Sequence, residues 1–174
     1  MILTNSVYES MKRECIETWK GLLNSGTQIV TPEQIVNNAW RALVIGNFMI
    51  AVGDQPNYSA GNVYGHLYEG ECSDTLRSFL LFGQTAVCPG MLKSMLDFRR
   101  ENTRFHVAGQ KLQLLAFAYW LTHDRSMIRD LKPDWRPSVD LILNSRQKES
   151  GLLPKDRYAG DLAKKVYSLD SNAN

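Results

Sequence analysis

The chain of 174 residues lacks the runs of lysine and arginine that are typical of proteins that bind nucleic acids or membrane surfaces. Its 20 basic and 18 acidic residues leave a net charge of +2, and no basic run is longer than a pair such as Arg99-Arg100. A charge so close to zero gives no electrostatic footprint for a polyanion or an anionic bilayer. We therefore expect neither nucleic acid nor a membrane as a partner.

Cysteine is scarce, and apolar runs are short. Cys15, Cys72 and Cys88 are odd in number and lack the paired spacing of a zinc site, so the sequence indicates neither a disulfide framework nor a metal site. We expect buried thiols in a reducing compartment, and no cofactor. No apolar run approaches the roughly 18 residues of a membrane span. The first residues show no apolar stretch typical of a signal peptide, which favours the cytoplasm.

Motifs of several common chemistries are also absent. The sequence contains no nucleophile elbow, P-loop, dinucleotide fingerprint or HExxH pair. Those motifs place a nucleophile, a phosphate cradle or a zinc ion by fixed spacing. The corresponding enzyme classes therefore have no support in the sequence.

Apolar residues recur at steps of three and four along most of the chain, the spacing of amphipathic helices. Thr31-Pro32-Glu33-Gln34 is typical of a capping box, and Ser73 is a candidate N-cap. No segment shows a convincing strand or hairpin pattern. The fold predicted is all-α, a series of antiparallel helical hairpins. The predicted helices cover residues 6–23, 31–52, 72–86, 91–100, 106–123 and 126–148, the last bent or stepped near Pro133 and Pro137.

The connection over residues 53–71 is far longer than the roughly two to eight residues usual between packed helices. Since long loops rich in aromatic and ionisable groups are commonly binding surfaces, we expect this loop to be one. Successive connections in a stack of antiparallel helices alternate between its ends. We therefore expect residues 53–71, 101–105 and the stretch after Lys148 at one end, and the tight turns 87–90 and 122–126 at the other. The loop carries Asp54, Tyr58, Tyr64, His66, Tyr68, Glu69 and Glu71.

Several stretches resemble the six-hairpin, (α/α)6-toroid glycosidases, the superfamily of glycogen-debranching, glucoamylase and trehalase-like enzymes. Residues 29–48 (IVTPEQIVNNAWRALVIGNF) resemble the first barrel helix, and residues 19–23 (WKGLL) resemble the end of the helix before it. The motif-like matches are residues 80–83 (LLFG), 121–124 (LTHD, against a TGD-like turn), and 151–154 (GLLP) with 158–161 (YAGD), against a GLLP…(Y/W)GD loop. The long loop departs from the family, because it offers YEGE at 68–71 where an RD or WD signature is common.

This resemblance implies a lead-in helix over residues 1–26 and a partial (α/α)6 toroid over residues 27–174. The predicted helices make about half of a toroid, so we expect the N-terminal half of a catalytic domain, truncated at its C-terminus. A half-toroid exposes an apolar edge, and self-association is then expected. The implied substrate is an oligosaccharide or other glycoside.

Glycoside hydrolysis usually needs two carboxyl groups, one as acid and one as base or nucleophile. By the resemblance, Asp161 is the candidate catalytic residue; sugar binding and a plain loop or capping role are its alternatives. Its partner carboxylate is expected in the missing half. Glu69 and Glu71 are candidate substrate contacts, although acids before a helix also stabilise its N-terminus. The candidate substrate-binding residues are Tyr64, His66, Tyr68, Glu69, Glu71, Arg157 and Tyr158.

Two functions remain open at this point. Tyrosines gathered on one face offer stacking platforms for sugar rings, which favours a glycoside hydrolase that uses paired carboxylates. The alternative is a non-catalytic scaffold of helical hairpins that binds a peptide or protein partner through the same loop-rich face, with each tyrosine anchoring its loop.

Overall fold

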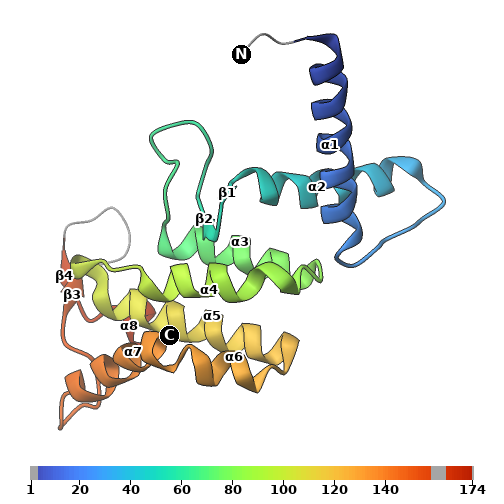
Figure 1. The fold of residues 1–174 in the computed structure, drawn as a ribbon. Helices are drawn as coiled ribbons and strands as arrows, with labels where there is room; N and C mark the ends of the chain where they lie inside the picture. The colour runs from blue at the N-terminus through green and yellow to red at the C-terminus, as the bar shows by residue number, and fades with distance from the viewer. Residues whose placement is uncertain (1–3, 158–163, 174) are drawn as a thin grey trace.

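The computed structural model of the chain describes residues 4–157 and 164–173 (Figure 1). Helices make up nearly all of the regular structure, and each strand has only two residues. The all-α fold of helical hairpins predicted from the sequence is therefore confirmed. No helix within the described ranges is long and apolar enough to cross a membrane.

The helices and strands follow one another in a simple order. The helices are α1 (Asn5–Asn24), α2 (Gln34–Met49), α3 (Glu69–Leu81), α4 (Cys88–Asp97), α5 (Arg104–Thr122), α6 (Arg125–Asp130), α7 (Lys132–Ser145) and α8 (Leu169–Ala173), with short 3-10 helices η1 (Thr85–Val87) and η2 (Glu101–Thr103). The strands are β1 (Ala51–Val52), β2 (Gln55–Pro56), β3 (Asp156–Arg157) and β4 (Lys165–Val166). They form two antiparallel pairs, β1 with β2 and β3 with β4. Two residues are too few for an alternating pattern, so the sequence gives no signal for these pairs.

The predicted capping box at the start of α2 is wrong. The Asn37 side chain accepts a hydrogen bond from the Thr31 backbone N–H at 2.8 Å and donates one to the Thr31 carbonyl at 2.9 Å. This pairing holds Thr31 outside the helix, and its hydroxyl donates to the Glu33 carbonyl at 3.1 Å. Glu33 is the N-cap, and its side chain makes no capping hydrogen bond.

The start of α3 also differs from the prediction. The helix begins at Glu69, three residues before the predicted start, with Tyr68 as its N-cap. Ser73 is therefore not a cap but an interior residue, whose hydroxyl donates to the Glu69 carbonyl one turn earlier. As a result Glu69 and Glu71 lie in the first turn of the helix, where acids interact favourably with the helix dipole.

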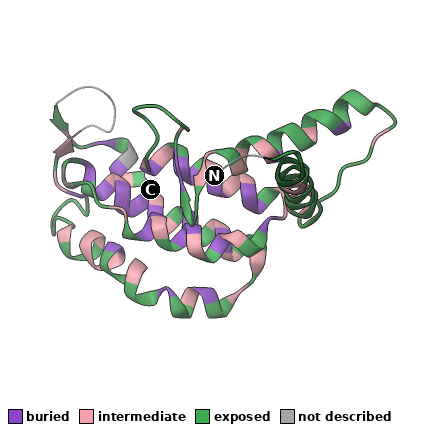
Figure 2. Cartoon of the chain, turned by 45° about the horizontal axis from the view of Figure 1, so that its top comes forward, coloured by how far each residue is buried: buried purple, intermediate pink, exposed green. Residues whose placement is uncertain are grey.

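The core lies among α3, α4 and α5, with α6 and α7 packed against it. Figure 2 shows the buried residues concentrated in these helices. On α5 the small residues Ala108, Gly109 and Ala118 are buried, which lets neighbouring helices approach closely. The fully buried large side chains are Phe79, Phe105, Leu76, Leu92, Leu96 and Leu114.

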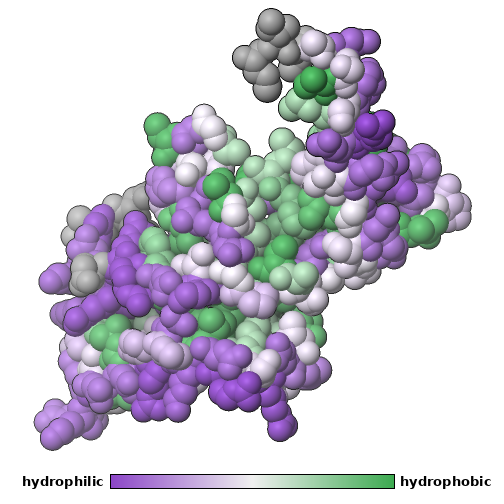
Figure 3. Space-filling model, in the orientation of Figure 1, coloured by the Kyte–Doolittle hydropathy of each residue, from purple (hydrophilic) through white to green (hydrophobic). Residues whose placement is uncertain are grey.

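The first two helices contribute little to this core. No residue of α1 is buried, and only Asn37 and Val44 are buried on α2. Ring contacts tie α2 to α3: the Phe48 and Phe79 centroids lie 4.7 Å apart, and those of Trp40 and Phe82 lie 4.8 Å apart. Figure 1 shows α1 projecting away from the packed helices, and Figure 3 shows apolar side chains on the surface between the 57–67 loop and α1.

The long connections meet at one end of the packed helices, as the alternation of connections predicts. Arg100, between α4 and α5, pairs with Glu69 at the start of α3. The strand β3, which follows α7, contacts η2 in that same connection. The short connections at residues 82–87 and 123–124 close the opposite ends of α3 and α5. The predicted tight turn at 87–90 is misplaced, because α4 begins at Cys88. The predicted step near Pro133 is also present, because α6 and α7 are separated at Leu131.

Candidate functional site

The long loop is held in shape by its own hydrogen bonds. The Asn57 N–H donates to the Ile50 carbonyl at 3.1 Å, beside the β1–β2 hairpin, and Asn57 is buried. Farther along, the Tyr58 N–H donates to the His66 carbonyl at 3.0 Å and the His66 N–H to the Tyr64 carbonyl at 2.8 Å. The bond between Tyr58 and His66 joins the outgoing and returning arms of the loop and restrains its shape.

Three tyrosine rings and one imidazole of this loop form an aromatic cluster. The Tyr58 ring meets those of Tyr64 and Tyr68 edge to face, with centroids 6.0 and 5.6 Å apart. His66 lies 4.5 Å from Tyr68, centroid to centroid. The Tyr68 N–H also donates to Cys72 Sγ at 3.1 Å, which fixes the backbone next to α3. Such clusters offer apolar ring faces together with hydroxyl groups.

Glu69 is the most constrained acid at this end of the molecule. Its side chain is 9% exposed, and its Oε1 accepts a hydrogen bond from Arg100 Nη1 at 2.7 Å. Its other oxygen, Oε2, is buried and has no partner among the described residues. Buried carboxylate oxygens are nearly always hydrogen-bonded, because leaving one unpaired costs free energy. An unpaired oxygen of this kind is suited to accept a hydrogen bond from a ligand hydroxyl.

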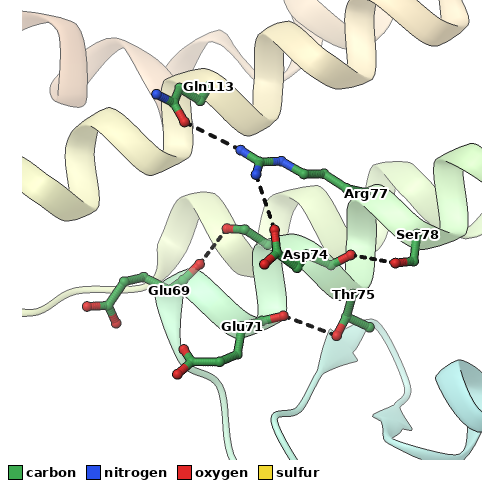
Figure 4. Close-up of polar contacts among 8 residues, drawn as sticks. Glu69, Glu71, Asp74, Thr75, Arg77, Ser78 and Gln113 are labelled. Atoms are coloured by element: carbon green, nitrogen blue, oxygen red, sulfur yellow. Dashed lines mark hydrogen bonds and ion pairs between the residues drawn. The ribbon is translucent and has the colours of Figure 1, made fainter. Parts of the chain in front are cut away.

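Glu69 and Glu71 extend from the first turn of α3 toward its N-terminal side (Figure 4). A hydroxyl group one turn later binds the backbone of this first turn: Thr75 Oγ1 donates a hydrogen bond to the Glu71 carbonyl at 3.2 Å. Arg77 lies farther along and joins Asp74 to Gln113 of α5, at 3.2 and 3.4 Å. Of these contacts, only the one between Arg77 and Gln113 joins α3 to α5.

A polar hollow of about 470 Å³ opens in front of Glu69. Its size falls within the range of small-molecule sites. Its lining combines three acids of α3 with one guanidinium and one imidazole. The hollow is lined by Tyr68, Glu69, Gly70, Glu71, Asp74, Arg100 and His106.

A second hollow of about 270 Å³ lies by β3 and the N-terminal turn of α5. Asp156 Oδ1 accepts a hydrogen bond from the Arg157 N–H at 2.8 Å, and its Oδ2 is buried without a partner among the described residues. Four cations line this hollow together with Asp156: Arg104, Lys155, Arg157 and Lys165. The two hollows therefore differ in charge, one rich in acids and one rich in cations.

Lys111 supports the connection that carries Arg100. Its side chain is buried, and its Nζ donates to the Leu96 carbonyl at 2.6 Å and to the Phe98 carbonyl, at the C-terminal end of α4. A cation here satisfies carbonyls that the helix end leaves free. Burial lowers the pKa of Lys111 to about 8, helped by repulsion from Arg99 and opposed by attraction to Asp97.

The structure brings together only part of the predicted site. Tyr68, Glu69 and Glu71 line the first hollow, while Tyr64 and His66 pack around Tyr68 without lining it. Arg157 lines the second hollow instead. The predicted catalytic Asp161 and the predicted contact Tyr158 lie outside the described residues.

Three residues of the site were not predicted from the sequence: Arg100, His106 and Lys111. In the sequence Arg100 is only one half of a basic pair, and only the folded chain brings it to Glu69. Lys111 does leave a signal, because it is the single lysine on a helix rich in apolar residues. A charge on such a helix is rarely buried without a hydrogen-bond partner, which points to a structural role.

Neither a metal-binding cluster nor similarity to a known protein indicates what this site binds. Among the described residues, no group of three or more His, Cys, Asp or Glu side chains is placed to hold a metal ion. Comparison with family models, with curated proteins and with solved structures finds no match to the chain.

Proposed function

We propose that the chain is part of a glycoside hydrolase and that the hollow in front of Glu69 binds a sugar unit of its substrate. The observation that carries this proposal is the state of the Glu69 carboxylate. One oxygen is fixed by Arg100, and the other is buried without a partner at the wall of a polar hollow. Sugar hydroxyls are donors of the kind that this oxygen lacks.

The residues around Glu69 support the same proposal. Arg100 and Glu71 line the hollow with it, so donors and acceptors for several hydroxyl groups converge there. Tyr68 adds a ring next to the hollow, and sugar rings pack their apolar faces on such rings. Since Glu69 is ion-paired, we assign it to substrate binding and not to proton donation.

The catalytic part of the proposal rests on the sequence resemblance. The YAGD motif at residues 158–161 supplies Asp161 as one carboxyl group of the pair that glycoside hydrolysis requires. Glu71 is the carboxylate of the hollow without a hydrogen bond or ion pair to another described side chain, and we assign it to substrate contact. Substrates with α-linked glucose or rhamnose units fit the resemblance.

Calorimetric titration with α-linked gluco-oligosaccharides and rhamnosides tests the binding step. Glu69→Gln keeps the shape of the side chain and removes its charge, so we expect affinity to fall by roughly tenfold or more, the usual worth of a hydrogen bond to a charged group. Glu17→Gln is the control, because Glu17 lies on exposed α1, where it pairs with Lys20. Absence of saccharide binding by the unmodified chain would contradict the proposal.

A non-catalytic scaffold is the second candidate, and the loop tip favours it. Val63 is 80% exposed and Tyr64 is 52% exposed, and neither lines the hollow. The affinity for a peptide partner that contacts this tip should fall in Tyr64→Ala and stay unchanged in Glu69→Gln. Selection of a peptide library against the two variants separates this candidate from the hydrolase.

A further inference from the structure

An apolar groove runs between α5 and the pair α6–α7, away from the connections that form the candidate site. Its floor is one stripe of α5, spaced at three and four residues: Leu112, Leu115, Ala116 and Tyr119. This stripe is about 10 Å long, since an α-helix rises about 1.5 Å per residue. Ile128 of α6 and Trp135 of α7 form the opposite wall. The groove encloses about 560 Å³, a volume typical of small-molecule sites.

Trp135 gives this wall an apolar surface despite its polar nitrogen. Its Nε1 donates a hydrogen bond to the Ile128 carbonyl at 2.9 Å. The indole is therefore satisfied within the wall, and its ring is left for apolar contact. Because the ring is only half-buried, ligand in the groove would change its exposure to water.

The rim of the groove carries charge of one sign. Arg125, Arg129 and Lys132 lie at successive turns of α6 and the start of α7, and no acid is among the described residues that line the groove. Arg129 pairs with Asp130, but both side chains are more than half exposed, so the pair is weak. Neither Arg125 nor Lys132 has an ion pair with any described residue.

An apolar floor beside three cations selects one class of occupant. A neutral apolar molecule leaves the cations without partners, and a cation is repelled by them. A molecule with an apolar chain and one anionic head satisfies both parts of the surface. We propose that this groove binds a small amphiphilic anion, a carboxylate with an unbranched chain that lies along the α5 floor while its head lies among Arg125, Arg129 and Lys132.

Titration with octanoate, octanol and octylammonium tests the proposal with three head groups on one chain length. We expect saturable binding of octanoate in calorimetry, with a change in tryptophan fluorescence that Trp135→Phe removes. Affinity should fall as salt is added, because exposed charges are screened. Equal or tighter binding of octanol or octylammonium, or no saturable binding of octanoate, would overturn the proposal.

Two variants separate the charged rim from the apolar floor. The double variant Arg125→Gln/Lys132→Gln should weaken octanoate binding by roughly two- to fivefold for each cation removed. Arg146→Gln/Lys148→Gln changes the net charge equally at residues that do not line the groove, and should leave affinity unchanged. Ala116→Phe fills the floor at an exposed position without changing charge, and should abolish binding. Thermal unfolding shows whether each variant is folded, and unaltered affinity in folded Ala116→Phe would overturn the placement.

Discussion

Arg100 Nη1 lies 2.7 Å from Glu69 Oε1, and this ion pair joins the connection between α4 and α5 to the first turn of α3. The two residues are 31 positions apart in the chain. The pair gives the carboxylate one fixed oxygen and leaves the other buried without a partner among the described residues. Binding geometry and local stability therefore depend on the same contact.

We expect Arg100→Gln to lower the free energy of unfolding by about 1 kcal/mol, because the Glu69 carboxylate then stays buried without its cation while Arg100 itself is half-exposed and partly screened. Urea unfolding measures the change. The double variant Arg100→Gln/Glu69→Gln should recover part of the loss, since no unpaired charge remains. Arg77→Gln is the matched control, because its partner Asp74 is largely exposed. An equal loss of unfolding free energy in Arg77→Gln would contradict the conclusion that the buried partner of Arg100 makes its ion pair more stabilising than an exposed one.

The pKa of Lys111 predicts a pH dependence of stability. Burial lowers it to about 8 in the folded chain, against an ordinary value of 10.5. Between these values the unfolded chain binds more protons, so the free energy of unfolding rises with pH across the window by up to about 1.4 kcal/mol per pH unit. The gain is lost as pH falls through about 8.

Urea unfolding across this window, compared between the unmodified chain and Lys111→Met, isolates the contribution. Methionine keeps an unbranched apolar stem and cannot titrate. The free energy of unfolding of Lys111→Met should therefore rise less steeply with pH. Lys148→Met, at an exposed position, should retain the original slope. Identical slopes for the unmodified chain and Lys111→Met would show that Lys111 titrates alike in the folded and unfolded chains.

The three cysteines should differ sharply in reactivity. Cys72 and Cys88 are buried, and burial raises the pKa of both thiols, that of Cys88 to about 11. Cys15 is exposed on α1, which corrects the expectation that all three thiols are buried. Alkylation depends on access and on the thiolate. Under native conditions we expect iodoacetamide to modify Cys15 alone, as read by mass spectrometry.

Unfolding in urea supplies the control for this experiment, because all three thiols should then react. Cys15→Ser should leave the folded chain unmodified. Modification of Cys72 at the rate of Cys15 in the folded chain would contradict the packing of α3, where Cys72 is fully buried.

The sequence predicts the helices far better than it predicts their contacts. The segment of α5 is recognisable because apolar residues recur along it at helical spacing, and the loop before α3 is recognisable by its length and its tyrosines. Both signals are local. The grouping of three connections at one end also follows from the sequence, since it needs only the order of antiparallel helices.

The errors arise where a side chain makes a contact that a local pattern does not contain. Thr31 fits a capping box by spacing, but Asn37 binds its backbone on both sides and moves the start of α2. Glu69 looks like a loop residue until Arg100 and the first turn of α3 fix it. Lys111 meets carbonyls of another helix, a pairing set by tertiary packing.

Gly26 and Gly21 provide a matched test of how α1 is attached. A Cβ at Gly26 would collide with the Phe82 carbonyl oxygen and lie 2.5 Å from Gln84 Nε2, whereas a Cβ at Gly21 has nothing within 4 Å. Gln84 is buried, accepts a hydrogen bond from Ser25 at 2.6 Å and donates to the Leu22 carbonyl at 2.9 Å. Gly26→Ala should therefore displace α1 from the end of α3.

Since α1 has no buried residue, this displacement should leave the core intact. We expect limited proteolysis to cut Gly26→Ala faster between α1 and α2, with thermal unfolding of the core nearly unchanged. Gly21→Ala lies within a helix, where alanine is favoured over glycine by up to about 1 kcal/mol, and should be cut no faster than the unmodified chain. Equal cleavage of the two variants would show that the Gly26 contact with Phe82 and Gln84 does not hold α1 in place, because both variants carry the same added methyl group and differ only in what it meets.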